Sequence, residues 1–229
     1  MITRRSTPNL AALLASLLVV AACTDLGGSG GGPAPTDAAA SPTAAGFAPT
    51  GCPTDQPAAL PAGQTRTVAI ATDLGTLELR IEADLSPIAA GNFVALAECG
   101  WYDGVVFHRV VPGFVIQGGD GENGRSPNVN PALVGTGGPG YTITDELVSA
   151  PYGRGVVAMA RTSQPDSVGS QFFIVLDDAA REALVSANTY QIIGTVTSGM
   201  EVADAITAAA DAEIPTLPIV MTDVTVSNP

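Results

Sequence analysis

Residues 107–120, with the sequence FHRVVPGFVIQGGD, contain two short runs of β-branched and aromatic residues separated by Pro112 and Gly113. Runs of this kind, bounded by glycine and proline, predict two strands joined by a turn. The stretch also holds the only histidine of the chain, His108, directly before Arg109. This pair admits two hypotheses: a general base beside a phosphate-binding arginine, or an arginine whose chemistry needs no proton transfer.

Further strands are predicted on both sides of this stretch. Residues 66–82 alternate apolar and polar side chains around a turn at Asp73–Gly75, which predicts a hairpin. Short apolar segments between glycine-rich turns follow at 140–144, 155–160, 170–176, 190–196 and 217–226. Together these segments predict a mainly β domain.

Two helices accompany the strands. For the first, over residues 86–100, Ser86 is expected to accept hydrogen bonds from the free amides of the first turn, Pro87 suits the first helical position, and Gly100 ends the helix. The second helix follows Ser198 and places three apolar residues on one face: Met200, Ala203 and Ile206. Many short strands with two helices indicate a closed barrel whose ends the helices cover.

The N-terminus has the features of an export signal. Two arginines precede an apolar stretch from Leu10 to Ala22, which is shorter than the roughly 20 residues of a membrane-spanning helix. The stretch ends in Val-Ala-Ala-Cys, which resembles a bacterial lipobox. Residues 1–22 are therefore expected to be a lipoprotein signal peptide and Cys23 the lipidated residue. An ordinary secretory signal with an incidental Cys23 is the alternative.

Residues 23–63 are rich in Gly, Ala, Pro, Ser and Thr, which predicts a flexible tether between the lipid anchor and a domain at 64–229. Apart from Cys23, the chain contains only Cys52 and Cys99. Outside the cytoplasm disulfides form and persist, so this pair favours one disulfide, with two unpaired thiols as the alternative.

The charge of the chain limits the classes of partner that it can bind. The chain has 22 acidic residues, nine arginines and no lysine, and a formal net charge of −13. This balance argues against binding to nucleic acid, because phosphate contacts need clustered cations. One histidine without a close cysteine pair supplies no metal-ligand set, and no cofactor is expected.

Taken in order, the long segments at 72–120, 135–147, 155–176 and 192–206 resemble the cyclophilin family of peptidyl-prolyl cis-trans isomerases. The resemblance covers nearly all of residues 64–229. It implies an eight-stranded antiparallel barrel capped by two α-helices, which agrees with the predicted elements. It also implies proline-containing polypeptides as partners, and we expect a monomer.

The resemblance implies one catalytic residue, Arg109, and a substrate groove on the outside of the barrel. Because rotation about a peptide bond breaks no covalent bond, no general base is required, and His108 is expected to be a structural hydrogen-bonding residue. The groove combines a proline pocket, two side-chain amides and a backbone stretch along which the peptide lies: Phe114, Val115, Phe173 and Tyr190 for the pocket, Gln117 and Gln171 for the amides, and Ala160 and Arg161 for the backbone.

The chain departs from the best-known family members at three places. Their tryptophan, which hydrogen-bonds the drug cyclosporin, falls where this chain has Leu184 or Val185, so weak cyclosporin binding is expected. Tyr190 replaces the histidine that lines their proline pocket. Residues 125–134 form an insertion of about ten residues, predicted as a surface loop near the groove that either shapes substrate choice or has no role.

These features predict a peptidyl-prolyl isomerase, held at the outer face of a cell membrane through Cys23, that accelerates folding of exported proteins. A membrane-tethered proline-peptide binding module or holdase with little catalysis is the alternative, favoured by the altered tryptophan and histidine positions. A solute-binding lipoprotein fits the anchor but not the motifs.

Overall fold

The computed structural model describes residues 48–187 and 189–228. The predicted signal peptide, Cys23 and the tether up to residue 47 lie outside these residues. Within the described ranges, no helix has the length and apolar character to cross a membrane.

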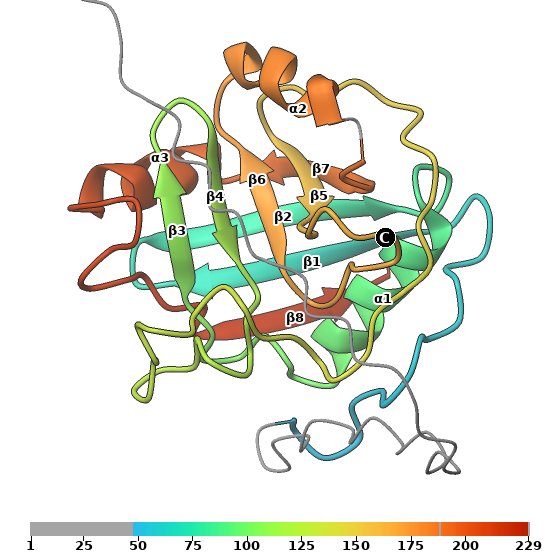
Figure 1. The fold of residues 1–229 in the computed structure, drawn as a ribbon, viewed down its shortest axis with the longest axis horizontal. Helices are drawn as coiled ribbons and strands as arrows, with labels where there is room; N and C mark the ends of the chain where they lie inside the picture. The colour runs from blue at the N-terminus through green and yellow to red at the C-terminus, as the bar shows by residue number, and fades with distance from the viewer. Residues whose placement is uncertain (1–47, 188, 229) are drawn as a thin grey trace, which may run out of the picture. The chain divides into compact units, whose positions relative to one another are not determined.

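Eight antiparallel strands form one sheet in the order β3-β4-β6-β5-β7-β2-β1-β8 (Figure 1). Figure 1 shows β3, β4, β6 and β5 crossing the direction of β1, β2 and β8, so the sheet is strongly curled. The strands are β1 (Thr65–Thr72), β2 (Gly75–Glu82), β3 (Phe107–Val111), β4 (Val115–Gly118), β5 (Val156–Met159), β6 (Phe172–Val175), β7 (Ile192–Ser198) and β8 (Asp223–Ser227).

The sheet is an open half-barrel, and the predicted closed ring is not what the described residues form. The edge strands β3 and β8 share no ladder. Instead, the segments that precede them are joined: Phe107 donates its N–H to the carbonyl of Ile219 at 2.9 Å, and Met221 donates to Val105 at 2.8 Å. The last strand begins six residues later than predicted, after Pro218, which has no N–H to give to a ladder.

The predicted strand at 140–144 is an isolated bridge between Ile143 and Val168. This segment is held by side chains of helix α1 rather than by a neighbouring strand. The hydroxyl of Tyr141, for example, donates to Oδ1 of Asn92 at 2.7 Å.

The two predicted helices are α1 (Pro87–Glu98) and α3 (Met200–Ala209), which Figure 1 shows at opposite ends of the curled sheet. Ser86 does not cap α1 with its side chain. Instead, the amides of Ile88 and Ala89 donate to the carboxylate of Glu146, each at 2.9 Å. A carboxylate is well suited to this end of a helix, where free amides and the helix dipole favour negative charge.

A third helix, α2 (Arg181–Ala187), follows a short 3₁₀ turn, η1 (Asp178–Ala180), and was not predicted from the sequence. It is only seven residues long, so it repeats its apolar pattern too few times to be recognised.

Buried apolar side chains form two clusters on opposite faces of the sheet. Neighbouring residues of a strand point to opposite faces, and β6 shows this directly: Phe172 belongs to the inner core and Phe173 to the outer cluster. The inner core contains edge-on aromatic contacts between Phe172 and the rings of Phe93 and Phe107. The outer cluster surrounds Phe173, and it forms the base of the candidate site.

Residues 48–63, which the sequence assigns to the tether, lie against the domain. Cys52 and Cys99 are joined by a disulfide. Leu60 is buried, and its N–H donates to the carbonyl of Pro87 at 2.9 Å. Gln56 accepts a hydrogen bond from the N–H of Thr144. The packed part of the chain therefore begins before residue 64.

Candidate active site

Three of the predicted site residues lie in one row across the outer face of the sheet. Arg109 on β3 is the direct partner of Gln117 on β4, and Gln117 is the partner of Phe173 on β6. Cross-strand partners project to the same face. Strand pairing therefore brings a cation, an amide and an aromatic ring together from segments far apart in the sequence.

A cavity of about 250 Å³ opens beside this row. It collects eight of the nine groove residues that the sequence predicts, together with one from α2: Arg109, Phe114, Val115, Gln117, Ala160, Arg161, Phe173 and Tyr190, with Leu184. The structure thus brings a guanidinium, an amide and an apolar surface to a single concave site.

Gln171, the ninth predicted residue, lies next to this cavity. Its Oε1 accepts a hydrogen bond from Nε2 of Gln117 at 3.0 Å, and its own Nε2 donates to the carbonyl of Gly137 at 2.9 Å. It lines an adjoining cavity of about 690 Å³ that shares Gln117, Ala160 and Arg161 with the first. The two glutamines therefore form a fixed amide pair at the border between the two cavities.

The apolar surface of the site is rigidly supported. The rings of Phe173 and Tyr190 meet edge to face, with centroids 5.4 Å apart. The hydroxyl of Tyr152 donates to the carbonyl of Tyr190 at 2.9 Å, which fixes the segment that carries the second ring. Burial raises the pKa of Tyr152 to about 12, so this hydroxyl keeps its proton at neutral pH.

Helix α2 closes one side of the cavity with Leu184, which is buried, whereas Val185 is exposed. The sequence left both residues open as occupants of the family's tryptophan position. The structure places Leu184 in the site. An aliphatic side chain there supplies apolar surface but no N–H donor.

Arg109 is held by Glu213, a contact that was not predicted from the sequence. Its Nε donates to Oε1 of Glu213 at 2.7 Å, and the N–H of the next residue, Val110, donates to the carbonyl of Glu213 at 2.8 Å. Glu213 is 104 residues away in the chain, so no local pattern could reveal the pair. The N–H groups on the two terminal nitrogens of Arg109 have no partner among the described residues, which leaves them free to bind a substrate.

Arg161 has a different environment from Arg109, although both line the cavity. Its Nη1 lies 2.7 Å from Oδ2 of Asp145, and its other donors bond to the carbonyls of Thr162 and Gln164. The guanidinium of Arg161 therefore stabilises the conformation of the loop that carries it. This agrees with the predicted role of the Arg161 backbone, rather than its charge, in the groove.

His108 does not line the cavity that contains Arg109. It is 4% exposed, and its ring nitrogens are buried without a hydrogen bond of good geometry, although the side chain of Gln171 and the backbone of Val106 lie close enough to interact with the imidazole. Burial lowers the pKa of His108, although the nearby carboxylate of Asp120 opposes this effect. Because the imidazole is absent from the lining of the Arg109 cavity, the geometry gives no support to the general-base hypothesis. Among the described residues, no group of histidine, cysteine and acidic side chains could hold a metal ion.

Residues 67–226 match the family model of the cyclophilin type peptidyl-prolyl cis-trans isomerases. The chain belongs to this family. It is an enzyme of the peptidyl-prolyl cis-trans isomerase class. In this isomerase, Arg109 forms an ion pair with Glu213, and Leu184 of α2 lines the groove.

Similar proteins come from several organisms. A probable peptidyl-prolyl cis-trans isomerase of Brucella abortus is 39% identical over 149 residues, which are 64% of this chain and 74% of the relative. Peptidyl-prolyl cis-trans isomerase B of Bacillus subtilis is 39% identical over 133 residues, or 57% of this chain and 82% of the relative. The fold is similar to that of a cyclophilin type isomerase from Cryptosporidium parvum, with a TM-score of 0.60, 30% identity, and coverage of 72% and 99% of the two chains. That protein has also been crystallised in the presence of the dipeptide Ala-Pro.

Proposed function

We propose that this isomerase acts at X–Pro bonds of exported proteins, that Arg109 stabilises the twisted amide, and that the Phe114–Val115–Phe173–Tyr190 surface holds the proline ring. The observation that carries the proposal is the placement of a guanidinium with free terminal N–H groups beside an apolar cavity and a fixed amide pair.

The chemistry requires charge stabilisation rather than proton transfer. The barrier to rotation is about 18–20 kcal/mol, because amide resonance is lost midway. At that point the nitrogen lone pair is localised, and a permanently charged guanidinium can donate a hydrogen bond to it or to the carbonyl oxygen. Every tenfold increase in rate needs about 1.4 kcal/mol of selective stabilisation. A charge-assisted hydrogen bond that is made only in the twisted state supplies about two to three such steps.

The other groups keep one half of the substrate fixed while the other half turns. Phe173 and Tyr190 meet edge to face, which gives the proline ring a firm apolar wall. Gln117 is held by Gln171, which leaves the second hydrogen of its amide and its Oε1 for the peptide backbone. The binding of the ring, the backbone and the twisted bond is thus divided among different side chains.

Exchange NMR on a short Ala-Pro peptide tests this mechanism. The wild-type protein is expected to accelerate cis–trans exchange, and Arg109→Ala to reduce the acceleration by about a hundredfold or more, a loss of about 2.7 kcal/mol. Arg80→Ala is the matched control, because Arg80 is an exposed arginine on β2 outside the cavity. Full activity in Arg109→Ala would disprove the role of Arg109. Binding without catalysis by the wild type would favour the holdase alternative.

We further propose that the protein is a monomer anchored to the outer face of the cell membrane by a lipid on Cys23. The support is the Val-Ala-Ala-Cys sequence after the apolar segment, and the Cys52–Cys99 disulfide, which suits an oxidising compartment. Mass spectrometry of the N-terminal peptide is expected to find a diacylglyceryl adduct on Cys23. Cys23→Ser is expected to move the protein from the membrane fraction to the soluble fraction, and an unchanged distribution would exclude the lipid anchor.

A further inference from the structure

Residues 52–60, which we call the arm, precede the segment that matches the family model and run along helix α1. The arm is attached at both ends of this helix. At one end, Cys52 is bonded to Cys99, the residue that ends α1. At the other, Leu60 is buried and donates its N–H to the carbonyl of Pro87, the first residue of α1, at 2.9 Å. The arm is therefore a fixed part of the folded domain.

Gly91 in the middle of α1 accommodates the arm. A Cβ atom at this position would collide with the carbonyl oxygen of Ala58 and would lie 2.8 Å from the backbone nitrogen of Leu60. Glycine is unfavourable inside a helix, so its presence here calls for such a reason. The sequence of α1 is thus adapted to the close approach of the arm.

The middle of the arm contacts the segment that precedes the groove. Oε1 of Gln56 accepts a hydrogen bond from the N–H of Thr144 at 2.8 Å. The carbonyl of Thr144 in turn accepts from Nε2 of the buried Gln191 at 3.2 Å. Gln191 directly follows Tyr190, whose ring lines the cavity that contains Arg109. The backbone of Thr144 therefore joins the arm to one wall of the active site.

The next residue, Asp145, connects the same segment to a second wall. Its Oδ2 lies 2.7 Å from Nη1 of Arg161, whose side chain is only 7% exposed. Asp145 and Asp166 also exchange hydrogen bonds, since the N–H of each donates to the carboxylate of the other, at 2.7 and 3.0 Å. The position of Asp145 therefore affects Arg161 and, through the chain, its neighbour Ala160, the backbone stretch along which a client is expected to lie.

These contacts bear on the part of the groove that only a long client reaches. The cavity of about 690 Å³ shares Gln117, Ala160 and Arg161 with the smaller cavity that contains Arg109. Tyr141 and Thr142, just before Thr144 in the chain, line the larger cavity as well. A polypeptide whose proline occupies the smaller cavity can continue into the larger one along the shared residues. A short Ala-Pro peptide fills the smaller cavity alone.

We propose that Gln56 is a positioning residue for the binding of long client polypeptides, and that the Cys52–Cys99 disulfide keeps it in place. A dithiol reductant breaks the sulfur–sulfur bond, leaves two thiols on the protein and is itself oxidised to a disulfide. The arm then keeps only its attachment at Leu60, and Gln56 is free to leave Thr144. The affinity for long clients therefore responds to the redox state of the compartment. The inference rests on the proposed function, since it requires a client in the groove.

Two substrates of different length test the proposal. Exchange NMR on the full-length protein gives kcat and KM for the short Ala-Pro peptide and for a longer peptide, in which the Ala-Pro bond is flanked on each side by four alanine or serine residues. Gln56→Ala is expected to raise KM for the longer peptide about threefold, the size expected for the loss of one neutral hydrogen bond. It should leave kcat unchanged and both constants unchanged for the short peptide.

Matched variants assign the effect to the hydrogen bond with Thr144. Gln64→Ala removes the same amide from an exposed position outside both cavities, where it accepts only from the side chain of Arg66, and should have no effect. Gln56→Glu keeps the acceptor oxygen and should restore the wild-type KM. Amide hydrogen exchange at Thr144 should be faster in Gln56→Ala than in the wild type.

Reduction tests the role of the disulfide. Dithiothreitol is expected to raise KM of the wild type for the longer peptide at least as much as Gln56→Ala does. In Cys52→Ser, KM should be raised already, and dithiothreitol should change nothing. If the reduced protein unfolds, Gln56→Ala, which keeps the disulfide, decides alone.

The two peptides also separate this inference from the proposed function. If the wild type accelerates exchange in neither peptide, the proposed function itself is wrong. If it accelerates both, while Gln56→Ala leaves KM for the longer peptide unchanged, only the positioning role is wrong. An equal loss with both peptides would mean that Gln56 supports the fold in general, which would also overturn the inference.

Discussion

The ion pair between Arg109 and Glu213 leads to a prediction whose size follows from the structure. Glu213→Ala removes the carboxylate that holds Nε of Arg109 at 2.7 Å. The two side chains are 36% and 60% exposed, and exposed pairs of this kind contribute about 0.2–1 kcal/mol. If that energy fixes the guanidinium in its catalytic orientation, losing it lowers kcat/KM by about 1.4- to 5-fold, since 1.4 kcal/mol corresponds to a factor of ten.

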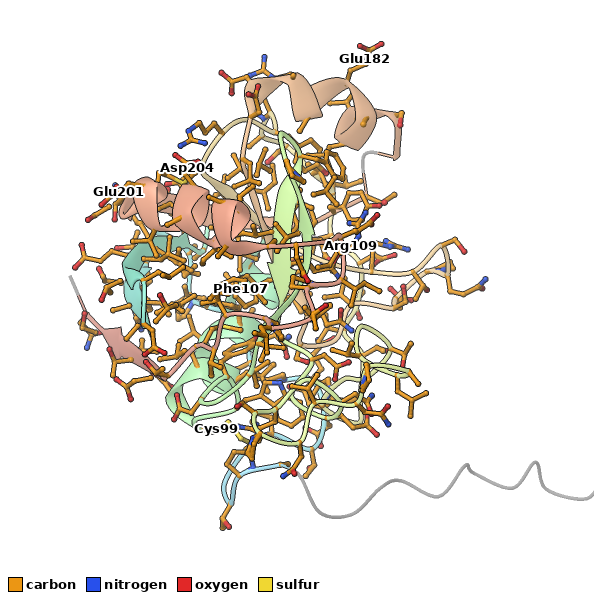
Figure 2. The ribbon with its side chains drawn as sticks, turned by 90° about the vertical axis from the view of Figure 1, so that its left-hand side faces the viewer. Cys99, Phe107, Arg109, Glu182, Glu201 and Asp204 are labelled. Carbon is orange, nitrogen blue, oxygen red and sulfur yellow. A yellow bond between two sulfur atoms is a disulfide. The ribbon has the colours of Figure 1, made fainter. Side chains whose placement is uncertain are left out.

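The assay is exchange NMR on the Ala-Pro peptide, with separate determination of kcat and KM. The loss is expected in kcat, because Glu213 acts on the group that stabilises the twisted amide and does not line the proline pocket. Glu213→Gln, which keeps an acceptor without the charge, should recover part of the rate. Glu201→Ala is the control, because Glu201 is exposed on α3 and has no hydrogen-bonded partner among the described side chains (Figure 2).

A double mutant shows whether Glu213 acts through Arg109. In an Arg109→Ala background, Glu213→Ala should have no further effect on kcat/KM. The opposite sign would refute the reasoning: a higher kcat/KM in Glu213→Ala would mean that the carboxylate weakens the guanidinium by neutralising its charge, and that orientation contributes little.

Three further outcomes are expected. Reduction of the Cys52–Cys99 disulfide, whose cysteines are 47 residues apart, should lower the free energy of unfolding by about 4 kcal/mol in the chain-entropy description, and equal urea midpoints with and without reductant would contradict this. Burial lowers the pKa of His108 in the folded state, so below its ordinary pKa of 6.5 the unfolded chain binds the proton first. The free energy of unfolding should therefore decrease as the pH falls from about 6.5 to 5. Urea unfolding over this range should show a weaker pH dependence in His108→Asn than in the wild type. Cyclosporin should inhibit weakly, because Leu184 has no N–H to donate, and half-inhibition at nanomolar drug in the exchange assay would show otherwise.

The strands could be predicted wherever apolar and polar residues alternate along the sequence. The hairpin of β1 and β2 follows from the pattern at 66–82, and both ends of α1 follow from Pro87 and Gly100. Interactions between distant segments could not be predicted from local sequence patterns. Nothing near Ser86 indicates that Glu146 would cap the helix instead, and nothing near Arg109 indicates Glu213.

The groove was predictable for a different reason. No periodicity joins Arg109, Gln117 and Phe173, and only the resemblance to a family placed them together. Strand register then explains the result, since these three residues are direct partners across β3, β4 and β6. The position of the insertion at 125–134 lies beyond that reasoning, because the compact family form has no counterpart from which it could be inferred.

The Cys52–Cys99 disulfide also decides where a mechanical load would enter the domain. A pull on the chain before Cys52 meets this covalent bond first and passes into the end of α1, where Cys99 lies (Figure 2). The segment 53–63 and the edge of the sheet at β1 are bypassed, because the loop between the two cysteines is closed. Non-covalent contacts such as that of Leu60 with Pro87 therefore bear none of the tension. Residue 52 is in this sense the load-carrying end of the domain, and the β1–β2 hairpin, which lies inside the closed loop, is shielded from such a load.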